Sequence, residues 1–113
     1  MSNVTIYHNP RCTKSRQTLD LLRDQGIEPE IVEYLKDPPD VKRLELLIHQ
    51  LGIQAAELIR AREYRDLGLP NSDDSSELIA QMIAHPEIIQ RPIVVKGNSA
   101  RIGRPPERVL EIL

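Results

Sequence analysis

Apolar positions near the N-terminus follow two different spacings. Val4–Tyr7 is a short apolar run typical of a buried strand, and Glu30–Tyr34 is a second run that contains β-branched residues. Between them, the segment from Cys12 to Gln25 has apolar residues at helical spacing, and Gly26 follows it as a typical helix terminator. A strand, a helix and a strand within about 30 residues predict a βαβ unit with parallel strands.

The middle of the chain is predicted to be helical. Three helices are expected, from Val41 to Leu51, from Ala55 through Arg60 to Gly68, and from the Asp74–Glu77 segment to Pro86. Gly52 ends the first pattern, and Asp74–Glu77 has the sequence of a capping box. The preceding polar run, Asn71–Ser75, is expected to be an exposed loop.

The last part of the chain predicts a hairpin and a final helix. Ile93–Val95 is a clear strand, the Gly97-Asn98 pair turns the chain, and Ala100–Ile102 pairs back. The final helix begins at Arg104-Pro105-Pro106, with Val109, Leu110 and Leu113 expected to face the core. The order of elements is βαβ, a helical insert, then ββα. This order predicts an α/β protein of the thioredoxin type with a mixed four-stranded sheet.

Length and charge restrict the possible functions. The chain has 113 residues, which fits one domain spanning residues 1–113. A formal net charge of -2 gives no support to nucleic-acid binding, although most of the fifteen Lys and Arg residues are Arg, whose rigid fork suits oxyanions. No signal pattern or membrane-spanning stretch is present, so a cytoplasmic protein without membrane association is expected. One cysteine and three scattered histidines offer no metal-ligand spacing, and we expect no metal or bound cofactor.

The single cysteine, Cys12, is the candidate reactive group. Asn9-Pro10 is a turn signal that places Cys12 at the first turn of the helix, where unpaired N–H groups and the helix dipole favour a thiolate. His8 and the basic residues Arg11, Lys14 and Arg16 add charge or donors around it. The plainer alternative is a buried, inert cysteine. The polar and basic neighbours favour a nucleophile instead, with a pKa below that of a free thiol.

Ser15 and His8 each have two interpretations. Ser15 lies three residues after Cys12 on the same helical face, so its hydroxyl is positioned to donate to the thiolate or to cap the first turn. His8 is either a structural histidine or a group that acts on Cys12 from the end of the first strand. We favour the functional interpretation of His8 and weigh the two interpretations of Ser15 evenly.

Four sequence blocks resemble a known family over essentially the whole chain. The blocks are His8-Asn9-Pro10-Arg11-Cys12 with Ser15-Arg16 and Thr18-Leu19, then Leu58-Ile59-Arg60, then Arg91-Pro92-Ile93-Val94-Val95, and finally Gly103-Arg104-Pro105. In this order and spacing they resemble the glutaredoxin-coupled arsenate reductases, close to the members without a long C-terminal tail. The resemblance implies a thioredoxin-like fold and an enzyme that reduces arsenate to arsenite.

The resemblance also implies the roles of individual residues. Cys12 would attack arsenate, Arg60, Arg91 and Arg104 would converge to hold the oxyanion, and His8 would help keep Cys12 ionised. Glutathione as co-substrate and glutaredoxin would then reduce the covalent arsenic adduct. The thioredoxin-type fold further predicts a cis peptide bond between Arg91 and Pro92.

Two alternatives belong to other functional classes. A redox-sensing adaptor or regulator of the same fold, of the Spx type, typically carries a Cys-x-x-Cys pair, and Ser15 stands where the second cysteine would be. A glutathione-dependent thiol transferase with another substrate would use Cys12 but leaves the three arginines unexplained. Arsenate reduction is therefore the preferred hypothesis.

Overall fold

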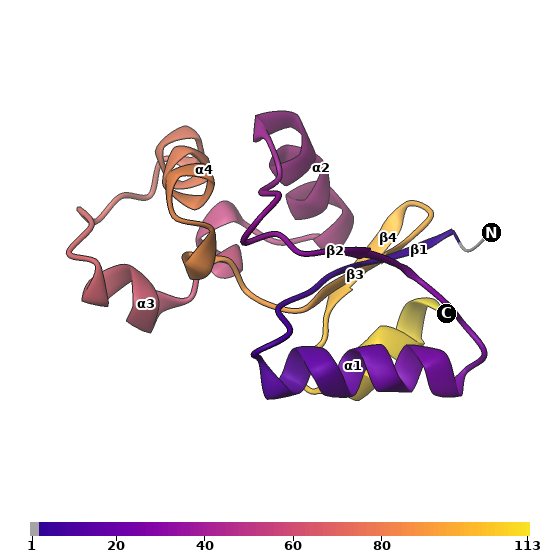
Figure 1. The fold of residues 1–113 in the computed structure, drawn as a ribbon. Helices are drawn as coiled ribbons and strands as arrows, with labels where there is room; N and C mark the ends of the chain where they lie inside the picture. Colours follow the sequence, from indigo (N-terminus) through magenta and orange to yellow (C-terminus); the bar gives the residue numbers. More distant parts are fainter. Residues whose placement is uncertain (1–2) are drawn as a thin grey trace. The chain divides into compact units, whose positions relative to one another are not determined.

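The computed structural model describes residues 3–113 and divides into two compact units. The first unit combines the N-terminal stretch up to Asp37 with Arg91–Leu113, and we call it the sheet unit. The second unit, Pro38–Gln90, contains only helices and their connections, and we call it the helical unit. Figure 1 shows the helical segments that follow β2 (Glu30–Val32) and precede β3 (Ile93–Lys96) in the chain.

The sheet unit contains a mixed four-stranded sheet. Its strands are β1 (Val4–Tyr7), β2 (Glu30–Val32), β3 (Ile93–Lys96) and β4 (Ser99–Ile102), in the order β2-β1-β3-β4. β1 pairs in parallel with β2, while β3 pairs antiparallel with both β1 and β4. The predicted βαβ and hairpin topology is confirmed. β2 is shorter than expected, because the chain turns after Val32 and the N–H groups of Lys36 and Asp37 donate to the Glu33 carbonyl.

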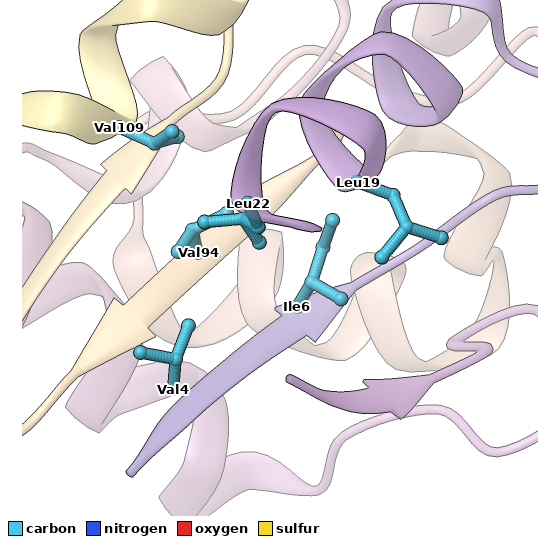
Figure 2. Close-up of a cluster of buried hydrophobic side chains, with 6 residues drawn as sticks. All are labelled: Val4, Ile6, Leu19, Leu22, Val94 and Val109. Carbon is cyan, nitrogen blue, oxygen red and sulfur yellow. The ribbon is translucent and has the colours of Figure 1, made fainter. Parts of the chain in front are cut away.

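Helix α1 (Thr13–Asp24) packs its apolar face on the sheet. A buried cluster joins α1, β1, β3 and the C-terminal segment, and Figure 2 shows its members: Val4, Ile6, Leu19, Leu22, Val94 and Val109. Burying one side chain of this size contributes about 1.5–3 kcal/mol. This packing holds the second half of α1 on the sheet, and Cys12 directly precedes the first residue of the same helix.

The C-terminal segment η3 (Pro106–Ile112) is a 3₁₀ helix that packs beside α1. A 3₁₀ helix has three residues per turn, so positions three apart share one face. Val109 is therefore fully buried and Ile112 packs against the same cluster. Leu113 also packs there, but Leu110 is 41% exposed, so the prediction that Leu110 faces the core is wrong.

The helical unit contains three α-helices and two 3₁₀ turns among the described residues. They are α2 (Val41–Leu51), η1 (Ala55–Leu58), α3 (Ala61–Asp66), α4 (Ser75–Ala84) and η2 (Pro86–Ile88). Gly52 ends α2 in the left-handed conformation, with φ of 69°, as the sequence predicts. None of the helices within residues 3–113 has the length and apolar character needed to cross a membrane.

The expected continuous helix from Ala55 to Gly68 is wrong. Ile59 and Arg60 are extended, and Ile59 forms an isolated antiparallel bridge with Ile89. The Arg60 N–H donates to the Ile88 carbonyl at 2.7 Å, and the Gln90 N–H donates to the Leu58 carbonyl at 2.8 Å. The bridge therefore satisfies the backbone groups that a continuous helix would have used.

The capping box predicted at Asp74–Glu77 is only half formed. Asp74 caps α4 by accepting from the Ser76 N–H at 3.2 Å. The Glu77 carboxylate instead accepts from the Ser72 hydroxyl in the preceding loop. The start of α4 is therefore predicted correctly. The predicted partner of Glu77, the backbone N–H of Asp74, is replaced by the Ser72 hydroxyl.

Candidate active site

Cys12 is the N-cap residue of α1. Its backbone is extended, with φ of -90° and ψ of 122°, and its carbonyl accepts the first helical bond from the Arg16 N–H at 3.0 Å. The Cys12 N–H donates to the Asn9 carbonyl at 3.0 Å, so the Asn9-Pro10 turn sets the start of the helix. The Cys12 side chain is partly exposed. The thiol therefore lies where orphan helix N–H groups meet solvent.

The pKa of Cys12 is lowered, although its partial burial acts in the opposite direction. Burial disfavours the thiolate and raises the pKa. The backbone N–H of Ser15, the Arg91 side chain and the backbone N–H of Lys14 donate to the sulfur and outweigh burial, and the charge of Arg104 adds to them. Cys12 is thus more acidic than an ordinary cysteine, as expected of a nucleophile.

Two of the predicted arginines lie at the sulfur atom. Arg104 Nη2 is 3.5 Å from Cys12 Sγ, and Arg91 also donates a side-chain hydrogen bond to this sulfur. Arg104 Nε donates to the Arg91 carbonyl at 2.7 Å, which holds the guanidinium in place. The predicted cis peptide bond between Arg91 and Pro92 is confirmed, and a second one joins Arg104 and Pro105.

Gly103 allows the Arg104 turn to approach α1 closely. A Cβ atom at this position would lie 2.6 Å from Thr18 Oγ1 and 2.9 Å from Pro92 Cγ, which are impossibly short contacts. The Gly103 N–H also donates to the Pro92 carbonyl at 2.9 Å. A side chain at residue 103 would therefore push Arg104 away from Cys12. Gly103 precedes a candidate arginine in the sequence, but no pattern in the sequence indicates its contact with Thr18.

His8 and Ser15 form a buried pair beside the cysteine. His8 Nδ1 lies 2.6 Å from Ser15 Oγ, and the same oxygen accepts the Asn9 N–H at 3.0 Å. Burial lowers the pKa of His8, Glu33 raises it in part, and Arg23 and Arg16 lower it further. His8 is therefore neutral near pH 7 and adds no positive charge at Cys12. It contacts the Ser15 hydroxyl.

Ser15 reaches Cys12 through its backbone. The N–H of Ser15 favours the thiolate, while the hydroxyl is engaged with His8 and Asn9. The sequence had suggested a hydroxyl bond to the sulfur or a capping bond by the side chain. In the structure, the Ser15 hydroxyl instead accepts the Asn9 N–H and so links the Asn9-Pro10 turn to α1.

Arg60, the third predicted arginine, belongs to the helical unit. It is the N-cap residue of α3, and Glu63 one turn later holds its guanidinium with Nε–Oε2 and Nη2–Oε1 distances of 2.7 and 3.3 Å. The pair is partly buried, which favours a fixed orientation of the guanidinium. That Arg60 joins Arg91 and Arg104 at Cys12 stays a prediction.

The described residues 3–113 hold no group of three or more His, Cys, Asp and Glu side chains arranged as metal ligands. Cys12, Arg91 and Arg104 together provide an activated thiolate beside two guanidinium groups. Such a site can attack an electrophilic centre and hold the negative charge that surrounds it.

A lowered-pKa cysteine that caps the first helix after β1, in this mixed sheet, is typical of thioredoxin-like thiol proteins. The ArsC family model matches residues 7–112, and the chain belongs to the ArsC family. YfgD, an uncharacterized protein of Escherichia coli strain K12, is 53% identical over 97% of this chain and 96% of its own. An arsenate reductase of the same strain is 47% identical over 100% of this chain and 82% of its own. The solved structure of an arsenate reductase from Vibrio cholerae has a TM-score of 0.91 at 49% identity, covering 97% of each chain.

Proposed function

We propose that the protein is an arsenate reductase in which Cys12 attacks arsenate and Arg60, Arg91 and Arg104 bind the oxyanion. The observation that carries the proposal is the 3.5 Å contact between Arg104 Nη2 and Cys12 Sγ, with Arg91 donating to the same sulfur. A tetrahedral oxyanion needs several charge-assisted donors, and arginine provides them in a fixed geometry. Relatives named arsenate reductase, 47–49% identical to this chain, support arsenate as the oxyanion.

The first step forms a bond between the Cys12 sulfur and arsenic. The thiolate donates the electron pair, and one arsenate oxygen takes up protons and leaves as water. Negative charge on the remaining oxygens is stabilised by the guanidinium groups of Arg91 and Arg104, which lie at the sulfur. His8 and Ser15 support this step indirectly, because they fix the turn that presents Cys12.

The second step needs a thiol from outside the chain, which contains a single cysteine. A glutathione thiolate attacks the Cys12 sulfur, and the sulfur–arsenic bond breaks with its electron pair leaving on arsenic. Arsenic is thereby reduced to arsenite, and the two sulfur atoms are oxidised to a mixed disulfide. Glutaredoxin then restores Cys12 by thiol–disulfide exchange.

The test measures arsenite release with glutathione plus glutaredoxin, and separately with thioredoxin plus its reductase. We expect turnover with the first system, little with the second, and none for Cys12→Ser. Arg104→Gln should lower kcat/KM by about 100-fold or more, as loss of a donor to a developing oxyanion does in other enzymes. Arg108→Gln is the matched control, because Arg108 is exposed and pairs only weakly with Glu111.

The role of Arg60 is tested in the same assay. Arg60→Gln should raise the KM for arsenate and lower kcat/KM, whereas Arg62→Gln, two residues further on the exposed surface of α3, should not. Equal effects of the two substitutions would remove Arg60 from the proposed site. Absence of arsenite with either reductant, while Cys12 still exchanges with glutathione disulfide, would favour a thiol transferase or a redox-sensing regulator.

A further inference from the structure

The start of α1 carries positive charge, which is unfavourable at a helix N-terminus. No acidic residue lies in its first turn, and none precedes Asp20 anywhere in the sequence. Lys14 instead occupies that turn, three residues after a cationic turn residue, Arg11. Cations at a helix N-terminus oppose the macrodipole. A local feature that works against its own helix is typical of a functional site.

Arg11 and Lys14 differ from the other cations near Cys12. Both are exposed, and neither side chain makes a hydrogen bond or ion pair with any residue of 3–113. Arg16 lies back over the turn, donating to the Pro10 carbonyl and the Thr13 hydroxyl. Arg91 and Arg104 are partly buried and reach the sulfur itself. The site thus has an inner cationic pair at the sulfur and an outer one that is open to solvent.

We propose that Arg11 and Lys14 bind the carboxylates of the thiol co-substrate as it approaches Cys12. The inference rests on the proposed function, which needs an outside thiol as well as an oxyanion at each turnover. The inner arginines suit the oxyanion, because it must lie within bonding distance of the sulfur. A glutathione-type tripeptide carries two carboxylates at a distance from its own sulfur. The two outer cations, one residue before and two residues after Cys12 in the sequence, complement them in charge.

Thiol–disulfide exchange tests the proposal without arsenate. The Cys12 thiolate attacks one sulfur of a symmetrical disulfide, a mixed disulfide forms, and the other half leaves as a thiolate, so electrons balance. The probes are glutathione disulfide, which is anionic, and hydroxyethyl disulfide, which is neutral. The ratio of the two rate constants cancels the fraction of Cys12 that is ionised. The ratio therefore reports recognition of the probe's charge.

The variant is Arg11→Gln combined with Lys14→Gln, and Lys96→Gln is the matched control. Lys96 is a cation of the same unit, but it pairs with Val4 at the opposite end of β1 from Cys12. We expect the double variant to lower the glutathione-to-neutral ratio by roughly 3- to 10-fold, since each exposed ion pair contributes little. Raising the salt concentration should lower the wild-type ratio in the same direction.

Three outcomes would overturn the proposal. The first is an unchanged ratio in the double variant, and the second is an equal fall in Lys96→Gln. The third is a double variant in which only resolution of the mixed disulfide by glutaredoxin slows, which would assign the cations to a protein partner. The double variant could lower the glutathione-to-neutral ratio although the wild-type protein releases no arsenite. That result would support binding of the thiol co-substrate by Arg11 and Lys14 and would contradict the proposed reduction of arsenate.

Discussion

At the scale of single residues, the acidity of Cys12 results from opposing contributions. Burial acts against ionisation, and three donated hydrogen bonds together with the Arg104 charge overcome it. Two of these donors are backbone N–H groups, so most of the activation depends on where the helix begins. The arginines add to an effect that the fold already provides.

Arg104→Gln should raise the pKa of Cys12, because it removes a positive charge 3.5 Å from the sulfur. The pH dependence of iodoacetamide alkylation measures this pKa, and the wild-type midpoint should lie below the free-thiol value of about 8.5. Arg101→Gln is the control, since Arg101 pairs with Glu111 instead. A wild-type midpoint at or above the free value would contradict the proposed activation.

The same shift predicts how stability depends on pH. The folded pKa of Cys12 lies below the unfolded one, so the thiolate adds stability above the unfolded pKa of about 8.5. This contribution is lost as the pH falls through the folded pKa. Urea unfolding of wild type and Cys12→Ser should therefore diverge as the pH rises, and parallel curves would show that the folded thiolate is not favoured.

Ser15→Ala should destabilise the fold more than it alters the thiol. Ser15 is fully buried, and its loss leaves the Asn9 N–H and His8 Nδ1 without their partner. An unsatisfied buried group costs about 1–3 kcal/mol, measurable as a fall in the free energy of unfolding. The alkylation midpoint should move less than in Arg104→Gln, because the backbone N–H of residue 15 remains.

Comparison with an exposed serine separates the two effects. Ser76→Ala removes a hydroxyl from the solvent-facing start of α4 and should change neither quantity appreciably. A Ser15→Ala midpoint that rises as far as that of Arg104→Gln would mean that the hydroxyl acts on the sulfur directly. The sequence alone had left that possibility open.

The sequence locates the reactive residues better than it predicts their protonation states. Cys12, Arg91 and Arg104 could be chosen from turn signals and a family resemblance, and the structure brings these three together. The lowered pKa of His8 could not be predicted, because its largest cause is burial in the folded protein. Local patterns contain no measure of that burial.

At the scale of elements, predictions held where local signals agreed with tertiary packing. β1, α1 and the β3–β4 hairpin have clear periodicity and turn residues, and their bounds agree with prediction to within a residue or two. The break at Ile59–Arg60 was missed because its cause is a bridge to Ile89, thirty positions away. Leu110 was misplaced because a 3₁₀ helix presents different residues from an α-helix at the same sequence positions.

The junction between Gly103 and α1 should be intolerant of a side chain. Gly103→Ala forces Cβ against Thr18 and Pro92, and we expect a loss of about 1–3 kcal/mol in unfolding free energy. The displaced turn should also raise the Cys12 alkylation midpoint, since Arg104 follows directly. Adding Thr18→Ala removes both Thr18 atoms from the contact and should restore part of each loss. Strictly additive effects in the double variant would show that the two residues are not coupled.

At the scale of the whole molecule, the sheet unit carries His8, Cys12, Ser15, Arg91 and Arg104, while Arg60 lies in the helical unit inserted between β2 and β3. The site residues of the sheet unit come from both ends of the chain, so they meet only when β3 pairs with β1. The expectation of a single domain over residues 1–113 stays a prediction, and it has a measurable consequence.

We expect the two units to unfold together. Each contains about half of a 113-residue chain, and below about 70–80 residues a single core rarely provides more than 3–5 kcal/mol.

Native-state hydrogen exchange in increasing urea compares the stabilities of the two units without any substitution. The amides of Leu22 in α1 and Leu47 in α2 lie on buried helical positions, one in each unit. Both should reach the same free energy of opening and the same urea dependence, which is the mark of one cooperative unit. If Leu47 opens at a lower free energy with a smaller urea dependence, the helical unit unfolds on its own, and Arg60 would then leave the folded state before Cys12 loses its helix.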